Sequence, residues 1–228
     1  MPIENLFMIL ARWGHLLFGI TWIGMLYYFN FVQGGYFKAA SPEGLKDAKA
    51  KLAPSALWWF RWGAMFTFLT GLVLLGYVHG NGQINGYIVA GALMGTFMFL
   101  NVWLIIWPNQ KIVIGIREGD AATAGPKALL ASRTNTLFSA PMLLGMLGSF
   151  HGGGEAGSMV TGALINNQAA QMMGMGGFST GLWIVVVLVI ALELNAIFGK
   201  IGPMQSVKGV IHCSIGLSAI FLALLQFL

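Results

Sequence analysis

The sequence has very little charge. Only 8% of its 228 residues are Asp, Glu, Lys or Arg, whereas a typical soluble domain has about 25%. Hydrophobic residues make up 57% of the chain, and the mean hydropathy is +0.77. Because so few charges cannot cover a water-soluble globule, the composition indicates an integral membrane protein.

Cysteine is nearly absent as well, since Cys213 is the only one in the sequence. A single thiol excludes an internal disulfide, and the chain has no CxxCH motif for covalent attachment of a c-type haem. The sequence also has no P-loop, dinucleotide-binding, nucleophile-elbow or zinc-protease motif. Its basic balance does not indicate nucleic acid, because the Lys and Arg residues lie beside apolar segments.

Long hydrophobic runs are what the sequence does contain. A helix rises about 1.5 Å per residue, so about 20 apolar residues cross a bilayer core of about 30 Å. We therefore expect an all-α, polytopic, single membrane domain over residues 1–228. Its six transmembrane helices are predicted at about 12–32, 57–78, 86–107, 135–151, 179–199 and 208–228.

Glycine and proline predict where these helices end. The run Gln33-Gly34-Gly35 is expected to break the first span, and Pro141 is expected to kink the fourth. Between the first two spans, about 42–52, the pattern predicts an amphipathic helix that lies on the cytoplasmic surface and ends at Pro54.

Basic residues alternate between the connections. They follow the first, third and fifth spans and are absent after the second and fourth, which predicts that both termini lie outside (N-out/C-out). We assume a bacterial inner membrane as the location. The residues that set this orientation are Lys38, Lys46, Lys49, Lys51, Lys111, Arg117, Lys127, Arg133, Lys200 and Lys208.

Three of the four histidines fall on the outer side in this topology. His15 lies about one turn inside the first span, and His79 and His151 end the second and fourth spans. Imidazoles at similar depth on separate helices can supply two axial ligands to a haem b. The alternative is that each is an interface residue or a hydrogen-bonded helix cap.

A different polar group is expected near the inner side. Counting outward from residue 203 places Glu193 and His212 at nearly the same depth, and Asn101 reaches a similar depth from the third span. A carboxylate beside an imidazole is a plausible proton-handling pair, so both are catalytic candidates. The alternative is a structural hydrogen bond that fixes the register of the helices.

Three motifs together resemble the membrane domain of PuuD-type urate oxidases. They are R-W-G-H-L-L-F-G-I-T-W-I-G-M-L-Y-Y-F in the first span, N-V-W-L-I-I-W-P-N-Q-K at the end of the third, and A-S-R-T-N-T-L-F-S-A-P-M-L at the start of the fourth. The resemblance implies a helical membrane domain that works with a c-type cytochrome on the outer side. It also implies that His15 and His151, which fall where the family motifs have histidines, are the preferred metal ligands. His79 is the substitute.

Full-length members of that family carry a cytochrome c domain after the membrane part, so we expect this chain to be a stand-alone short form. The favoured function is a membrane haem-b redox protein that passes electrons to a periplasmic c-type cytochrome, and oxidoreductase is the enzyme class that this function implies. The alternative is a non-catalytic structural subunit of a larger respiratory-type membrane complex. A transporter is disfavoured, since Glu193 is the only carboxylate within the spans.

Overall fold

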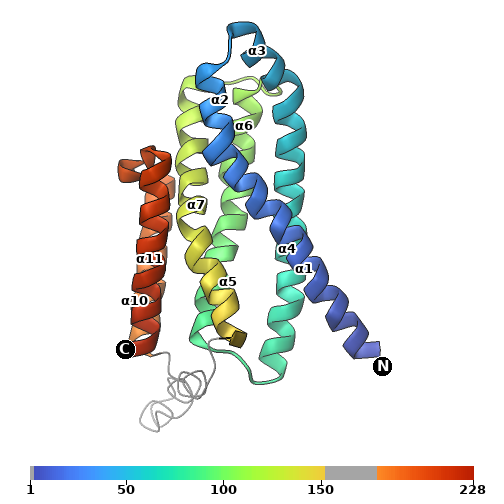
Figure 1. The fold of residues 1–228 in the computed structure, drawn as a ribbon, viewed down its shortest axis with the longest axis vertical. Helices are drawn as coiled ribbons and strands as arrows, with labels where there is room; N and C mark the ends of the chain where they lie inside the picture. The colour runs from blue at the N-terminus through green and yellow to red at the C-terminus, as the bar shows by residue number, and fades with distance from the viewer. Residues whose placement is uncertain (1–2, 152–178) are drawn as a thin grey trace.

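The computed structural model describes residues 3–151 and 179–228, and within these ranges its regular elements are all helices. This confirms the all-α fold (Figure 1). The elements are α1 (Ile3–Tyr27), η1 (Tyr28–Gln33), α2 (Gly34–Ala39), α3 (Pro42–Asp47), η2 (Ala48–Leu52), α4 (Ala53–Gly80), α5 (Gly86–Leu100), η3 (Asn101–Ile106), α6 (Trp107–Val113), α7 (Ala121–His151), α10 (Thr180–Phe198), η4 (Gly202–Gln205) and α11 (Val207–Phe227).

Five continuous helices in the described ranges are long and apolar enough to cross a membrane, so the chain is a multi-pass membrane protein. They are Ile3–Ala39, Pro42–Gly80, Gly86–Val113, Thr180–Phe198 and Val207–Phe227. The remaining predicted span corresponds to α7, which is 31 residues long and more polar. Helix α7 begins at Ala121, well before the expected start at residue 135, and packs against α1, α5, α6, α10 and α11.

The expected break at Gln33-Gly34-Gly35 is wrong. The helix continues through both glycines to Ala39, and Gly34 keeps right-handed helical angles, with φ −62° and ψ −33°. Glycine lowers helix propensity but does not forbid the conformation. Instead of a break, the chain has the π-helical segment η1 immediately before these residues.

The predicted helix end at Pro54 is also wrong, because the helix runs on from Pro42 to Gly80. A proline inside a helix lacks an N–H and crowds the carbonyl four residues earlier. The preceding turn, η2, is widened to a π-helix, and the Ala53 N–H donates to the Ala48 carbonyl five residues back. The same arrangement precedes Pro108, where the Trp107 N–H donates to the Val102 carbonyl at the end of η3.

Asp120 caps the start of α7. Its carboxylate accepts hydrogen bonds from the Thr123 hydroxyl and from the Ala122 N–H, the latter at 2.9 Å. These bonds hold the pKa of Asp120 below its ordinary value. The cap therefore acts at neutral pH and is lost as the pH falls through the lowered pKa.

Glycines bring the central helices into close contact. A Cβ added at Gly145 of α7 would lie 2.8 Å from the Tyr87 carbonyl oxygen of α5, and one at Gly91 would lie 3.4 Å from Gly145. Helix α1 crosses α4 in a similar way, because Gly63 faces the backbone of Trp22. Small residues at helix contacts are how membrane helices approach closely.

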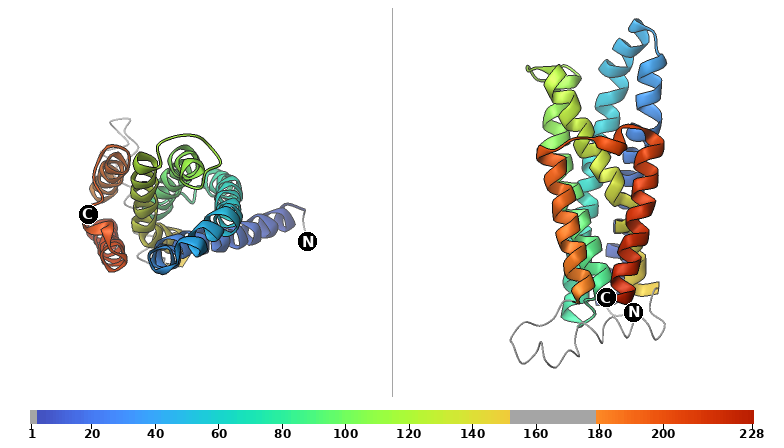
Figure 2. Two further views of the ribbon diagram at one scale, coloured as in Figure 1. Left: turned by 90° about the horizontal axis from the view of Figure 1, so that it is seen from above. Right: turned by 90° about the vertical axis from the view of Figure 1, so that its left-hand side faces the viewer.

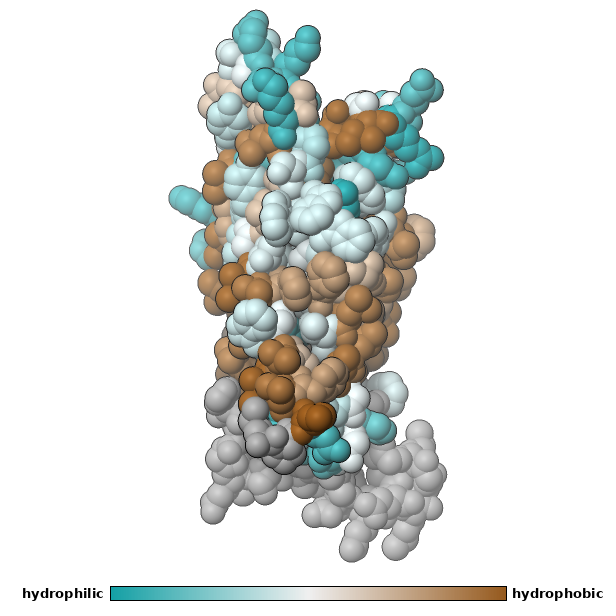
Figure 3. Space-filling model, turned by 90° about the vertical axis from the view of Figure 1, so that its right-hand side faces the viewer, coloured by the Kyte–Doolittle hydropathy of each residue, from teal (hydrophilic) through white to brown (hydrophobic). Residues whose placement is uncertain are grey.

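The helices form a body of α1, α4, α5 and α7, with the α10–α11 hairpin standing on one side against α7 (Figure 2). Both ends of the chain lie at the same end of the bundle, opposite α2 and α3 (Figure 1). A hydrophobic band separates the more hydrophilic ends (Figure 3). Which end faces outside remains a prediction from the basic residues.

Candidate functional site

His15 is anchored to α4 through one ring nitrogen. Its Nδ1 lies 2.9 Å from the Thr67 carbonyl oxygen and 3.1 Å from the Thr70 hydroxyl. A carbonyl oxygen only accepts, so Nδ1 carries the hydrogen and donates it. The neutral ring then keeps its lone pair on Nε2, which is the arrangement found in metal-ligating histidines.

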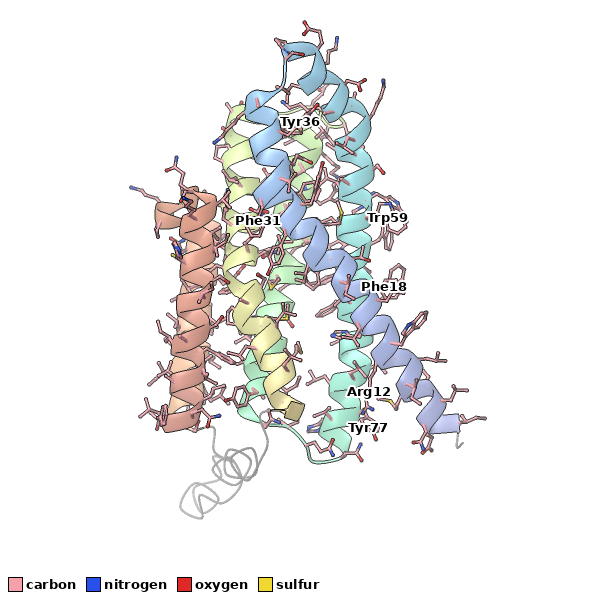
Figure 4. All side chains as sticks on the ribbon, in the orientation of Figure 1. Arg12, Phe18, Phe31, Tyr36, Trp59 and Tyr77 are labelled. Carbon is pink, nitrogen blue, oxygen red and sulfur yellow. The ribbon has the colours of Figure 1, made fainter. Side chains whose placement is uncertain are left out.

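Two features of α4 make room for this ring. A Cβ at Gly71 would lie 3.1 Å from His15 Cε1, so glycine allows the imidazole to rest against the helix. The hydroxyl of Thr70 donates to the Phe66 carbonyl at 2.6 Å and therefore accepts from His15. One turn toward the N-terminus, the Arg12 guanidinium lies 5.7 Å from the centre of the Tyr77 ring, and both are labelled in Figure 4.

His79 does not share the depth of His15, so the expectation of one common depth is wrong for this pair. His15 contacts α4 at residues 67–71, and His79 comes eight residues after Gly71, or about 12 Å along the helix axis. Its side chain is exposed. Axial ligands must meet at one iron, so these two histidines do not form a pair.

His151 is the last residue of α7, at the end of the bundle where α5 begins. In the turn before it, Ser149 accepts a hydrogen bond from Asn85, which caps α5. The His151 side chain lies outside the described residues, so its role as a metal ligand stays a prediction. Within residues 3–151 and 179–228, there is no group of three or more His, Cys, Asp or Glu side chains that could hold a metal ion.

Glu193 belongs to a buried hydrogen-bonded network that joins three helices. The Asn101 side-chain amide of η3 donates to Glu193 Oε2 of α10 and to Asn135 Oδ1 of α7, both at 3.0 Å. Asn135 in turn donates to the Met98 carbonyl at 2.9 Å. The expected common depth of Asn101 and Glu193 is thus confirmed by a direct contact.

His212 lies at about the same depth in the bundle as this network, but on an exposed face of α11. Ser214 of α11 donates to the Thr136 and Leu137 carbonyls, which places residue 212 near the level of Asn135. The His212 side chain is exposed, whereas Glu193 is only 6% exposed. The structure does not bring the two together, and their roles in proton handling remain predictions.

Sequence reasoning missed several buried polar residues of α7 and η1. Asn30 of η1 donates to the Ser132 hydroxyl at 2.8 Å, and the Tyr27 and Ser139 hydroxyls lie 2.9 Å apart. Arg133 is only 7% exposed, and neither its Nε nor its Nη1 has a hydrogen-bond partner among the described residues. The signal is present in the polar run 132–136, which the sequence pattern alone assigns to the loop and the start of a span.

Residues 79–160 match the family described as urate oxidase N-terminal. The matched stretch is 82 of the 228 residues, and it includes α5, η3, α6 and α7. No curated protein and no solved structure matches the chain. The middle of the chain is therefore similar to the membrane domain of urate oxidases, whereas α1, which carries His15, and the α10–α11 hairpin lie outside the match.

Proposed function

We propose that this protein is a membrane oxidoreductase component that binds haem b in the half of the bundle near its termini. The family similarity of residues 79–160 supports a redox role. The observation that carries the proposal is the hydrogen bond of His15 Nδ1 to the Thr67 carbonyl. It orients the ring and leaves Nε2 as the nitrogen that can bind iron.

The residues around His15 suit such a ligand. Thr67 and Thr70 fix the tautomer and the orientation of the ring. Both threonines are held in place because their hydroxyls donate to backbone carbonyls of α4 itself. Gly71 gives the ring space beside α4. His151, carried by the last turn of α7, is the proposed second ligand.

A bound haem b would supply one-electron transfer, and the chain would position the haem and shield it from water. His15 would hold the group close to the end of the bundle that we assign to the periplasm, where a c-type cytochrome can accept electrons. The apolar side chains of α1 and α4 would exclude water from that region. Glu193 remains the candidate for holding a proton near the inner side, with His212 as its exposed counterpart on α11.

The test is the haem content of detergent-purified protein, measured by a pyridine haemochrome assay and by oxidised and reduced absorption spectra. We expect a b-type spectrum in the wild type and loss of most haem in His15→Ala. His79→Ala is the matched control, because it removes an exposed imidazole from the same end of the bundle and should keep its haem.

A well-folded wild-type protein without haem would overturn the proposal, and so would equal haem content in His15→Ala and the wild type. Haem-free protein that co-purifies with stoichiometric membrane subunits would instead support the alternative of a structural subunit.

A further inference from the structure

Two cations meet on one tryptophan ring where α4 passes α6. The Arg61 guanidinium of α4 lies 3.9 Å from the centre of the Trp107 ring. The Lys111 ammonium, one helical turn further along α6, lies 5.5 Å from the same centre. All three side chains are half-buried. Because both distances end at one ring, the two positive charges cannot be farther apart than the two distances combined.

Neither cation has an acidic partner among residues 3–151 and 179–228, within which the one ion pair joins Lys51 and Asp47. Two like charges held this close repel each other, and the face of an aromatic ring offsets only part of that repulsion. An anion that contacts both side chains would remove it. The arrangement therefore favours a negatively charged ligand beside Trp107.

The contact with Trp107 leaves the hydrogen-bond donors of Arg61 available. A guanidinium that rests on an aromatic ring uses its face for that contact and keeps the N–H groups at its edge. The planar fork of these N–H groups matches the oxygens of a phosphate, and the Lys111 ammonium adds three further donors. A phosphate has enough acceptor oxygens to bind both residues at once.

The side chains around this cluster are those of a membrane interface. Trp58 and Trp59, in the turn of α4 before Arg61, are exposed, and Trp59 projects away from the bundle in Figure 4. Exposed tryptophans gather at the depth of the lipid headgroups. On the other helix, Leu104 lies one turn before Trp107 and is 68% exposed, and Leu100, one turn earlier still, is also exposed. The order along this helix is thus apolar, then aromatic, then cationic, as along a phospholipid from its acyl chains to its phosphate.

We propose that Arg61, Trp107 and Lys111 form a binding site for a phospholipid with an anionic headgroup. Its phosphate lies between the two cations, and its acyl chains lie against Leu100 and Leu104. A soluble phosphate would gain the charged contacts but not the apolar ones, so the surface suits a lipid. The site goes beyond the proposed haem role and does not depend on it.

The experiment is native mass spectrometry of the full chain released from detergent. The protein is titrated with phosphatidylglycerol or with phosphatidylcholine of identical acyl chains, and the Kd of the first bound lipid is measured. We expect phosphatidylglycerol to bind at least about tenfold more tightly, because the choline cation opposes the attraction of the phosphate to the two basic residues.

Two variants remove one cation each. Lys111→Gln and Arg61→Gln should each weaken the binding of phosphatidylglycerol about tenfold and leave that of phosphatidylcholine less affected. Lys127→Gln is the matched control, since it removes an exposed positive charge near the start of α7, at the same end of the bundle. It should bind phosphatidylglycerol as the wild type does. Circular dichroism of the lipid-free samples checks that each variant is folded.

Three results would overturn the proposal. The first is equal affinity for the two lipids in the wild type. The second is an equal loss of affinity in Lys127→Gln and Lys111→Gln, which would indicate attraction to the basic end as a whole. The third is displacement of phosphatidylglycerol by inorganic phosphate at a similar concentration, which would assign the cluster to a soluble anion.

Discussion

The side-chain amide of Asn101 is one of the polar groups that connect the C-terminal hairpin to the rest of the bundle. It reaches Glu193 on α10 and Asn135 on α7 from its place on η3. Inside a bundle with little water, the value of such a network depends on every member being paired. A substitution in this network is expected to lower the free energy of unfolding more when it leaves another polar group without a partner than when the new side chain keeps a similar shape and an acceptor atom.

This difference can be measured at Glu193. Glu193→Gln keeps an acceptor oxygen for Asn101, so the unfolding temperature in detergent should stay close to that of the wild type. Glu193→Ala leaves one Asn101 N–H unpaired and opens a space, and it should cost about 2–4 kcal/mol. Thermal unfolding followed by circular dichroism checks both variants. Equal destabilisation by the two would show that the charge matters rather than the hydrogen bond.

Residue depth could be predicted from the sequence, but residue direction could not. Counting along the helices placed Asn101 level with Glu193, and the two are bonded. The same counting placed His212 beside Glu193, yet His212 faces outward from α11. Depth depends on the rise per residue alone, whereas direction depends on how each helix is rotated. That rotation is set by contacts such as Ser214 with the Leu137 carbonyl.

At the scale of elements, two errors came from treating proline and glycine as helix ends. Pro54 and Pro108 each follow a π-helical turn that accommodates a residue without an N–H. Each helix therefore continues past its proline. An expectation based on the average behaviour of proline could not foresee these turns. The glycines of α5 and α7 have a different purpose, because they bring the two backbones together.

Glycine contacts between α5 and α7 can be tested with a matched pair of substitutions. Gly145→Ala places a Cβ 2.8 Å from the Tyr87 carbonyl oxygen, and such overpacking against backbone should cost about 1–3 kcal/mol. Gly95→Ala, also in this pair of helices, meets no atom within 4 Å and should be neutral or stabilising by up to about 1 kcal/mol. Thermal unfolding of both variants measures the difference, and a neutral Gly145→Ala would contradict close packing at this contact.

At the scale of the whole molecule, the fold gives the positions of the two ends but not their side of the membrane. Both termini lie at one end of the bundle (Figure 1), as the expected six crossings require. The sidedness rests on Lys and Arg, which follow the first, third and fifth crossings. It matters for the proposed function, because the N-out orientation would place His15 on the side where a periplasmic cytochrome could reach it.

Cysteine accessibility in intact cells tests this orientation. Cys213 is the only native cysteine. In a Cys213→Ser background, the labelling of one introduced thiol can therefore be measured at a time. Asn81→Cys, in the exposed turn between α4 and α5, should react with a membrane-impermeant maleimide. Lys46→Cys, at the opposite end in α3, should react only after the membrane is permeabilised. The reverse pattern would move His15 to the cytoplasmic side and remove the periplasmic cytochrome as its electron acceptor, whatever the haem content of the protein.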